Sequence, residues 1–351
     1  MKIAITADVH LHSKEVYSER YNALVNILDQ MITDKIKILV IAGDLFDKES
    51  QNYSEFDELC KLEKYSEIKF YIIPGNHDSG IESKYFTSNN VQIFNKPKIL
   101  QLGEPPLNFF FLPYVLDKSM GEIIAEYKNN LPEQWVLISH GDYLSGIRTP
   151  NPYEPGIYMP LSRTDIELFN PIKVILGHIH KKMEIGGVYY VGSPCGLNIN
   201  ETGKKSFSIV DTNNLDITTK TVDTDCIYFN ETLIALLTIN EFDYIKNKIS
   251  DMIEKWEISE SDIPKVRIRL KVKGYTADKG QLLSVIKDSF TNLAFYKDEE
   301  PDLTNVLIFN DPERIQIVEK VKEEIEKLEF DNEIIKKEDI LEQGLHIILK
   351  E

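Results

Sequence analysis

Short apolar runs alternate with longer amphipathic segments along the first part of the chain. Residues 2–7, 36–42 and 68–73 are mostly apolar, which is typical of strands that are covered on both faces of a sheet. Residues 17–32 place apolar side chains at helical spacing, and residues 53–66 form a second amphipathic segment. This alternation of strand and helix predicts an α/β domain built in layers.

The same alternation continues to about residue 225. Residues 135–139 and 172–176 are two more apolar runs, separated by a long polar loop at 143–162. Later segments with Gly and Asn turns between them are expected to form antiparallel strands at 188–191, 206–210 and 217–222. Residues 1–225 are therefore predicted to form one domain, a layered β-sandwich flanked by helices.

A smaller α+β domain is predicted at residues 226–305. Its expected strands are 233–239, 266–273 and 293–297, and its expected helices are 242–256 and 279–290.

The strand at 266–273 alternates strictly between two kinds of residue. Val266, Ile268, Leu270 and Val272 alternate with Arg267, Arg269, Lys271 and Lys273, so one face is apolar and the other is basic. Two interpretations stay open. The basic face is either simply solvated, or it contacts the phosphate backbone of a nucleic acid.

Residues 306–351 are predicted to form a charged C-terminal segment with two helices. Asp311 and Pro312 suit an N-cap and the first helical position. Apolar side chains then recur at Val318, Val321, Ile325 and Leu328, and in a second helix, 338–349, at Leu341, Leu345 and Ile348. These helices either pack on their own domain or dock as a hairpin on a partner.

Composition narrows the class of protein without indicating a substrate. The chain has 351 residues, of which 42% are hydrophobic and 28% are charged, as in a globular protein of two or three domains. Its net charge of -17 argues against non-specific coating of nucleic acid. A local cationic cleft, or a phosphodiester held by metal ions, remains compatible with this charge.

Signals for membrane insertion or secretion are not apparent. No stretch approaches the ~18 apolar residues of a membrane span, and the start of the chain lacks the apolar segment of a signal peptide. Cys60, Cys195 and Cys226 are widely spaced and form no CxxC pair. We therefore expect a cytoplasmic protein that does not bind a membrane.

Metal- and proton-binding side chains follow the predicted strands at five points. The motifs are Asp8-Val9-His10, Gly43-Asp44-Leu45-Phe46-Asp47, Gly75-Asn76-His77-Asp78, His140-Gly141 and Gly177-His178-Ile179-His180. Five of the seven histidines lie in these motifs, and only His12 and His346 lie outside them. Because open α/β sheets gather their sites at strand ends, the motifs are expected to form one site.

The residue types in these motifs suit a pair of divalent metal ions. Two such ions a few ångströms apart need oxygen and imidazole ligands, with one carboxylate bridging them. The ions stabilise the attacking and leaving oxygens of a displacement at phosphorus. The neighbouring glycines allow tight turns and a close approach of substrate. The motifs therefore predict metal-assisted hydrolysis of a phosphoester.

The five motifs, in this order, resemble the calcineurin-like metallophosphoesterase superfamily over residues 1–222. The resemblance implies that metal one is held by Asp8, His10, Asp44 and His180, and metal two by Asp44, Asn76, His140 and His178. It also implies that His77 stays off the metals and acts as general acid or transition-state stabiliser. Asp47 would orient His77 and keep it protonated. Alternatively, Asp47 caps the following helix.

Three further residues, His12, Asp78 and Cys195, have expected roles outside the ligand set. His12 is expected at the surface, and Asp78 either caps a turn or takes part in the chemistry. Asp142 receives no role. Cys195 is expected to pack in the interior, because the ligand set is complete without it.

A closer resemblance is to the nuclease subunits of SbcCD complexes and their archaeal and eukaryotic double-strand-break relatives. It rests on the runs 43–47, 174–181, 190–194 and 203–207. It also rests on the order of parts, with a small capping domain and a C-terminal helical segment after the catalytic domain. The archaeal and eukaryotic relatives have His where this chain has Asp47, so the closer kinship is with bacterial members.

This closer resemblance implies a manganese-dependent DNA nuclease that takes part in DNA repair and recombination. Its expected activities are 3′–5′ exonuclease and single-strand endonuclease cleavage at duplex or hairpin ends, with two Mn²⁺ ions. Residues 226–305 would be a capping and DNA-binding domain. Residues 306–351 would bind an SbcC-like coiled-coil ATPase, and helices of the catalytic domain would form a homodimer.

Two other functions stay open at this stage. One is a small-molecule phosphodiesterase or phosphatase of the same fold, which would need neither capping domain nor tail. The other is a catalytically silent scaffold, which the complete ligand set argues against. The loop at 146–153 is expected either to contact substrate or to act as a mobile lid.

Overall fold

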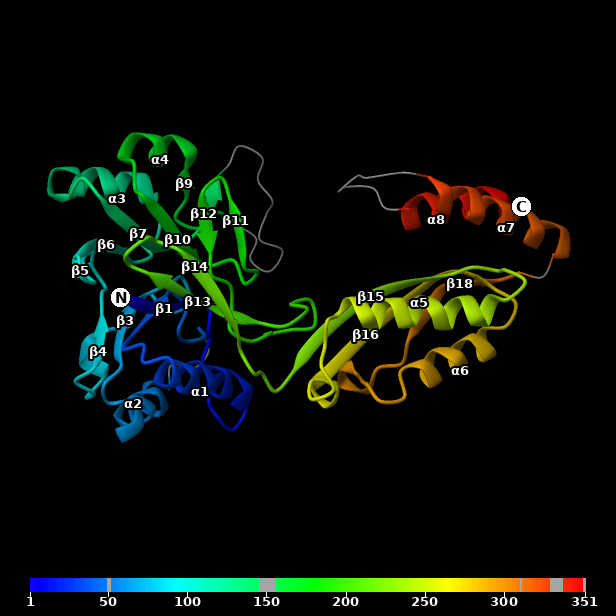
Figure 1. Ribbon diagram of the computed structural model, residues 1–351, viewed down its shortest axis with the longest axis horizontal. Coiled ribbons are helices and arrows are strands. Elements are labelled where there is room, and N and C mark those ends of the chain that lie inside the picture. Colours follow the sequence, from blue (N-terminus) through cyan, green and yellow to red (C-terminus); the bar gives the residue numbers. More distant parts are fainter. Residues whose placement is uncertain (49–51, 145–155, 310, 329–336, 350–351) are drawn as a thin grey trace. The chain divides into compact units, whose positions relative to one another are not determined.

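The chain forms two compact units (Figure 1). The computed structural model describes residues 1–48, 52–144, 156–309, 311–328 and 337–349, so the loop at 146–153 lies outside the described residues. The first unit is Met1–Gly196 with Lys204–Asp225, and the second is Leu197–Gly203 with Cys226–Glu351. No helix among the described residues is long and apolar enough to cross a membrane.

The first sheet of the first unit has the order β14-β13-β1-β2-β3-β4. Its strands are Lys2–Thr6 (β1), Ile38–Ala42 (β2), Lys69–Ile73 (β3), Val91–Ile93 (β4), Ser206–Asp211 (β13) and Ile217–Thr221 (β14). Strands β1 to β4 are parallel, and β13 is antiparallel to β1. Helices α1 (Ser18–Thr33) and α2 (Tyr53–Lys61) lie along its outer face (Figure 1). The apolar runs therefore form the centre of a sheet with both faces covered.

The second sheet has the order β11-β12-β10-β7-β6-β5. Its strands are Lys98–Leu102 (β5), Leu107–Leu112 (β6), Trp135–His140 (β7), Lys173–Gly177 (β10), Met183–Ile185 (β11) and Val188–Tyr190 (β12). Strand β12 pairs in parallel with β10, so the antiparallel prediction for 188–191 is wrong in that pairing. Its antiparallel neighbour is the short β11, across the turn at Gly186 and Gly187.

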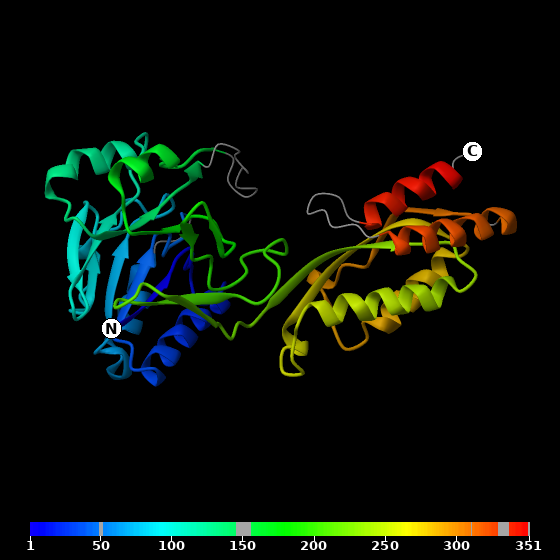
Figure 2. The same cartoon turned by 45° about the horizontal axis from the view of Figure 1, so that its top comes forward.

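The two sheets pack face to face, and helices cover the second sheet from outside. Phe109 and Phe111 of β6 join the core between the sheets. Phe110 and Leu112, which alternate with them, pack against α3 (Met120–Tyr127) and α4 (Arg163–Phe169) (Figure 2). A short parallel pair, Tyr143–Leu144 (β8) and Leu161–Ser162 (β9), lies beside them. The predicted layered α/β fold is confirmed.

The second unit is built on a four-stranded sheet with β16 at its centre. Its elements are Ile227–Ala235 (β15), Glu241–Lys255 (α5), Val266–Thr276 (β16), Lys279–Ser289 (α6), Ala294–Phe295 (β17) and Asp302–Ile308 (β18). All three other strands run parallel to β16. Helices α5 and α6 lie together on one face of this sheet (Figure 2) and share its apolar core.

The strand predicted at 233–239 starts earlier and ends earlier than expected. In β15, Phe229 and Leu233 enter the core, but Glu231 occupies the inward position between them and breaks the apolar alternation. Its carboxylate accepts a hydrogen bond from Trp256 Nε1 at 2.9 Å. Strand β18 was not predicted, because most of its side chains are polar or exposed.

The two C-terminal helices pack on their own unit. Helices α7 (Pro312–Lys327) and α8 (Lys337–Leu349) share an apolar cluster with Leu236, Leu237 and Tyr275. Val318 is fully buried in this cluster, whereas Leu328 is 46% exposed. The side chains of Leu345 and His346 lie outside the described residues.

Single 3-10 turns occur at Glu63–Tyr65, Ser83–Tyr85, Lys128–Asn130, Ile263–Lys265 and Tyr296–Asp298.

Candidate metal centre

Five strands of the first unit end at one edge, where ligand-type side chains follow them. These side chains are Asp8 and His10 after β1, Asp44 and Asp47 after β2, Asn76 and His77 after β3, His140 at the end of β7, and His178 and His180 after β10. The strands run parallel within each sheet, so their carboxyl ends come together.

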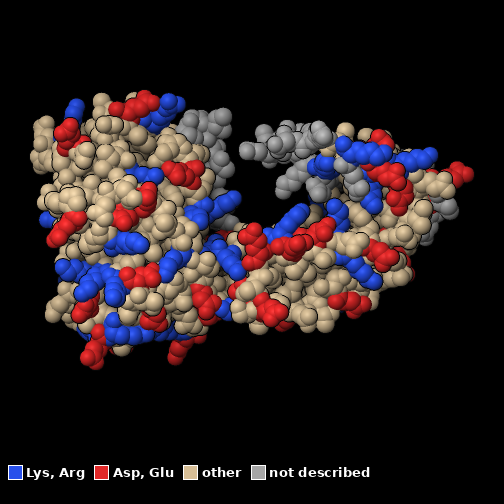
Figure 3. All heavy atoms as spheres, in the orientation of Figure 1, with Lys and Arg blue, Asp and Glu red and all other residues tan. Residues whose placement is uncertain are grey.

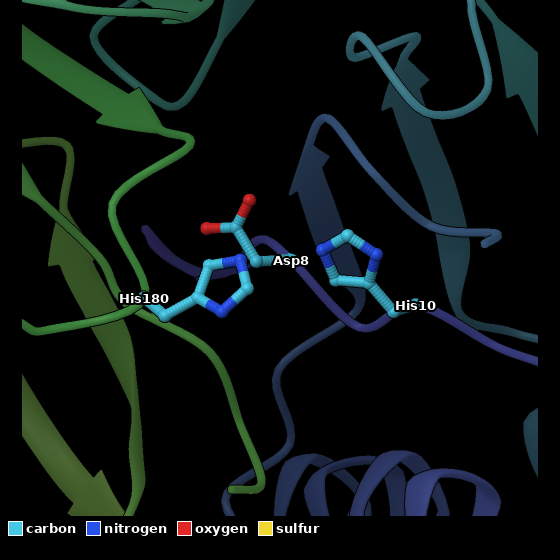
Figure 4. A group of neighbouring side chains, drawn as sticks. All are labelled: Asp8, His10 and His180. Atoms are coloured by element: carbon cyan, nitrogen blue, oxygen red, sulfur yellow. The ribbon is translucent and has the colours of Figure 1, made fainter. Parts of the chain in front are cut away.

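Within the described part of the chain, three overlapping groups of side chains could each hold a metal ion. They are Asp8, His10 and His180; His10, Asp44 and His77; and Asp8, Asp44 and His140, with ligand atoms within 4.8 Å of one another. Figure 4 shows Asp8 between His10 and His180, with its carboxylate next to the His180 ring. Asp8 and Asp44 each belong to two groups, as a pair of ions that share a carboxylate requires.

Two further predicted ligands lie beside these groups. Asn76 Oδ1 is 3.0 Å from His140 Nε2. The backbone N–H of His178 donates to the Asp8 carboxylate at 3.0 Å, and the His178 ring lies 5.4 Å from that of His140, centre to centre. Asp142 Oδ1 is 3.8 Å from His178 Nε2. The structure thus gathers all seven predicted ligands in one place.

The ligand loops use backbone conformations that ordinary residues avoid. The φ angles of Asp8, His10, Asp44 and His178 are 54°, 49°, 51° and 92°. Positive φ at residues other than glycine costs roughly 1–3 kcal/mol each and persists where the surrounding structure enforces it. Such outliers cluster at functional sites, and here four of them lie within a single group of buried polar side chains.

Two glycines give the ligands room. A Cβ atom at Gly43, which has a φ of 93°, would lie 2.1 Å from His140 Nδ1. A Cβ atom at Gly75 would lie 2.1 Å from Asp44 Oδ1. Any side chain at these positions would displace a ligand, so the glycines of both motifs are required by the packing of the site.

Burial and mutual charge set the protonation of the cluster. Burial raises the pKa of Asp8. Burial alone would also raise the pKa of Asp44, but the charge and hydrogen bond of His140 outweigh it and hold this pKa well below its ordinary value. Burial would lower the pKa of His140, yet the Asp44 and Asp8 carboxylates raise it to about 9.

His10 has the properties of a metal ligand. Burial lowers the pKa of His10 to about 3, so its ring is neutral at pH 7. Its Nε2 atom is buried and has no hydrogen-bond partner within the described residues; the nearest carboxylate oxygen, Asp44 Oδ2, is 3.7 Å away. A buried ring nitrogen is costly without a partner. A divalent cation would satisfy both groups, and the site therefore fits a metal.

His77 and Asp47 form a pair at the rim of the cluster. The backbone N–H of His77 donates to Asp44 Oδ1 at 2.8 Å, and its Nδ1 lies 3.7 Å from Asp47 Oδ1. The nearby His77 ring, followed by the hydrogen bond from Arg20, holds the pKa of Asp47 well below its ordinary value. The alternative role of Asp47 as a helix cap is wrong, because Asn52 occupies the cap position of α2.

Arg20 is a member of the site that was missed in the sequence. It lies on α1, is 7% exposed, and donates from Nη1 to Asp47 Oδ2 at 3.1 Å and to the His10 carbonyl oxygen. A signal was present in the sequence, because Arg20 stands four residues before Leu24 and so falls on the apolar face of the helix.

The remaining candidates make contacts that support the fold. Asp78 is fully buried and accepts from the backbone N–H groups of Gly75 and Phe46 at 2.7 and 3.1 Å. It therefore ties the loop after β3 to the loop after β2, which matches the turn-capping interpretation. His12 is half-buried and its Nδ1 accepts from the Ser13 N–H at 2.8 Å. Cys195 is buried, as expected.

The fold and the site together define a class of enzyme. The profile of the calcineurin-like phosphoesterases matches residues 1–199, and the chain belongs to this family. It is therefore a metal-dependent hydrolase of phosphoric esters, as the motifs predicted.

Individual relatives extend the similarity beyond the family domain. The chain is 26% identical to the SbcD subunit of the nuclease SbcCD from Staphylococcus saprophyticus, over 75% of this chain and 76% of that protein. It is 24% identical to the SbcD protein of Staphylococcus epidermidis, over 73% and 75%. It is also 25% identical to the uncharacterized metallophosphoesterase YhaO of Bacillus subtilis, over 60% and 57%. The predicted resemblance to SbcD-type proteins is confirmed.

Proposed function

We propose that this protein is a manganese-dependent DNA nuclease that cleaves phosphodiester bonds at DNA ends. The observation that carries the proposal is the buried group in which Asp8 and Asp44 are each shared between metal-binding sets. The family profile ends at residue 199, whereas the similarity to the SbcD protein of Staphylococcus saprophyticus covers 75% of the chain. That similarity therefore also involves residues outside the phosphoesterase domain.

The proposed assignment gives each site residue a role. Asp8, His10, Asp44 and His180 would hold one ion, and Asp44, Asn76, His140 and His178 the other. When bound, two divalent ions lower the pKa of water and neutralise charge on the phosphate. His77 holds a proton near the scissile phosphate for the leaving oxygen, and Asp47 orients the His77 ring from its Nδ1 side.

Lysines at the metal edge support a polyanionic substrate. Lys181 and Lys182 are exposed and directly follow His180. Strand β13 runs antiparallel to β1 with Ser208 opposite Ile5, so Lys204 and Lys205 at its start lie at the edge that carries Asp8. Lysines at the rim of a phosphoesterase site suit the phosphates that flank a scissile bond.

The proposed partners follow from the same similarity. An SbcC-like coiled-coil ATPase would bind α7 and α8, on which Ile317 and Ile347 are 48% and 77% exposed. Exposed apolar side chains of this kind are used for helix-in-groove contacts. A cytoplasmic location, a role in DNA repair and recombination, and a homodimer formed through helices of the first unit complete the proposal.

A direct assay tests the nuclease proposal. The full chain with Mn²⁺ is incubated with end-labelled linear duplex, hairpin and single-stranded DNA, and in parallel with bis(p-nitrophenyl) phosphate. The expected result is Mn²⁺-dependent shortening of DNA from its 3′ ends, absent in Asp44→Ala. Hydrolysis of the nitrophenyl ester with no cleavage of any DNA contradicts the nuclease proposal while leaving the phosphoesterase class intact.

A small-molecule phosphodiesterase is the second candidate. The observation that supports this candidate is the similarity to YhaO, a metallophosphoesterase without a stated substrate. A panel of cyclic nucleotides, dinucleotides and phosphomonoesters, assayed beside DNA at equal phosphate concentration, separates the two candidates by kcat/KM.

A further inference from the structure

Arg20 connects two parts of the site that the sequence keeps apart. Its Nη1 atom contacts Asp47 Oδ2, on the loop after β2, and the His10 carbonyl oxygen, on the loop after β1. Its guanidinium carbon lies 4.4 Å from the centre of the Tyr17 ring. One side chain thus reaches a proposed metal-ligand loop and the proposed acid pair at the same time.

The burial of Arg20 needs an explanation beyond packing. Leu24 and Leu28 follow it at intervals of four residues on the same face of α1, and both are fully buried. An apolar residue would cover that face at lower cost, because a buried guanidinium must be paired and hydrogen-bonded. Arg20 finds this pairing through Nη1, which donates to groups of the site, whereas its Nε atom has no hydrogen-bond partner among the described residues.

The contacts divide the Asp47 carboxylate between two neighbours. Oδ2 is held by Arg20 at 3.1 Å, and Oδ1 faces His77 Nδ1 at 3.7 Å. Fixing one oxygen fixes the plane of the carboxylate, so Arg20 determines where Oδ1 lies relative to the imidazole. The bond to the His10 carbonyl also anchors the loop in which His10 has a positive φ of 49°.

We infer that Arg20 is a positioning residue for hydrolysis, which aligns the Asp47–His77 pair with the metal-ligand loop that carries His10. The inference rests on the roles proposed above for His77 and Asp47. Lysine would not replace arginine fully, because its ammonium group lacks the planar guanidinium that fixes the direction of both Nη1 hydrogen bonds and lies against the Tyr17 ring.

The test compares Arg20→Ala, Arg20→Met and Arg20→Lys with wild type on bis(p-nitrophenyl) phosphate at saturating Mn²⁺. We expect Arg20→Ala and Arg20→Met to lower kcat by about 10- to 100-fold, the usual effect of losing a residue that orients a metal or catalytic group. KM and metal content should stay near the wild-type values. Arg20→Lys should recover part of kcat. Arg163→Ala, which removes an exposed arginine paired with Glu167, is the matched control and should leave kcat unchanged.

Coupling to Asp47 is measured in the double variant. If Arg20 acts through Asp47, Arg20→Ala combined with Asp47→Ala loses no more kcat than Asp47→Ala alone. If the losses of kcat in the two single variants multiply in the double variant, the inference is overturned. Wild-type kcat in Arg20→Met would also overturn it, because Arg20 would then be only a packing residue. Wild-type kcat in His77→Ala would instead contradict the proposed mechanism, which separates the two failures.

Discussion

The two units of the chain place their charged side chains in opposite ways. In the first unit, Asp8, Asp44 and His140 are at most 2% exposed and lie where strands end in strained loops. In the second unit, basic side chains alternate with apolar ones along strand β16, and Arg269 forms two hydrogen bonds of 2.8 Å with Glu299. Figure 3 shows acidic and basic side chains interspersed over the face that it presents.

The difference shows that buried clusters of charged side chains indicate catalytic chemistry, whereas exposed charged side chains indicate only a solvated surface. Burying several ionisable groups together lowers stability, so such a group persists where its chemistry is needed. Exposed charges cost little and contribute little. The cluster of the first unit therefore identifies the enzyme class, whereas the alternation in β16 predicts the strand and leaves its function open.

The largest expected effect comes from the proton-handling residue of the first unit. His77→Ala should lower kcat by about 10²- to 10⁴-fold, the range for loss of a general acid or base. Metal content should stay at the wild-type level, because the proposed ligands are all retained. Steady-state kinetics at saturating Mn²⁺ and metal analysis after dialysis provide the two measurements. Loss of metal from the variant would show that His77 is itself a ligand, as the group of His10, Asp44 and His77 allows.

The protonation of His140 predicts how metal binding depends on pH. Its pKa of about 9 means that the ring is protonated at pH 7 in the metal-free protein, so a proton must leave before the ring binds a metal. One released proton gives a tenfold rise in affinity per pH unit from pH 7 to about 9, and no further rise above that. Titration calorimetry of Mn²⁺ in buffers with different ionisation enthalpies counts the protons. A pH-independent affinity would contradict the predicted state of His140.

The sequence was sufficient to predict the elements whose physical signal is local. The runs at β1, β2 and β3 are continuous because these strands are covered on both faces, and the ligand motifs stand out because they follow such runs. The site residues came together as the parallel order of those strands requires. Their assignment to particular ions stays a prediction.

The missed features depend on contacts between distant segments. Strand β18 carries exposed polar residues such as Thr304 and Asn305, so it has no alternation to detect. The start of β15 was hidden by Glu231, which is tolerated because Trp256 donates to it. The role of Arg20 depends on the packing of α1 beside Asp47, 27 residues further along the chain. Helical spacing places Arg20 on the apolar face of α1, but local patterns carry no information about the distant residues that it meets there.

Asp57 provides the next test, because it is a buried carboxylate of the first unit without a proposed role in catalysis. Asp57 on α2 accepts hydrogen bonds from Thr87 and Ser88 and pairs with Lys61 at 2.6 Å, with its side chain 8% exposed. Asp57→Ala should lower the free energy of unfolding by about 1–3 kcal/mol at pH 7, because the donors of Thr87 and Ser88 lose a charged hydrogen-bond partner. Its kcat should equal that of wild type. Denaturant unfolding and kinetics measure the two quantities.

The pH dependence of this effect has a defined sign. Burial would raise the pKa of Asp57, but the hydrogen bonds of Lys61, Ser88 and Thr87 outweigh it and hold this pKa well below its ordinary value of 3.8. The stabilisation is therefore present above pH 3.8 and is lost as the pH falls below it. The difference between wild type and Asp57→Ala should shrink in acid. A difference that grows in acid would contradict the assigned pKa direction.

The smallest expected effect belongs to the basic face of β16. Lys271 is exposed, whereas Arg269 is engaged by Glu299. If this face contacts the phosphate backbone, Lys271→Ala should weaken DNA binding a few-fold and reduce the salt dependence of binding by about one counterion. Arg269→Ala should have less effect, because its charge is already paired. Hydrolysis of bis(p-nitrophenyl) phosphate should be unchanged in both variants.

Equal DNA affinity and salt slope for wild type and Lys271→Ala would assign the basic face of β16 to solvent. DNA binding would then depend on the first unit alone, where Lys181, Lys182, Lys204 and Lys205 lie at the edge that carries Asp8.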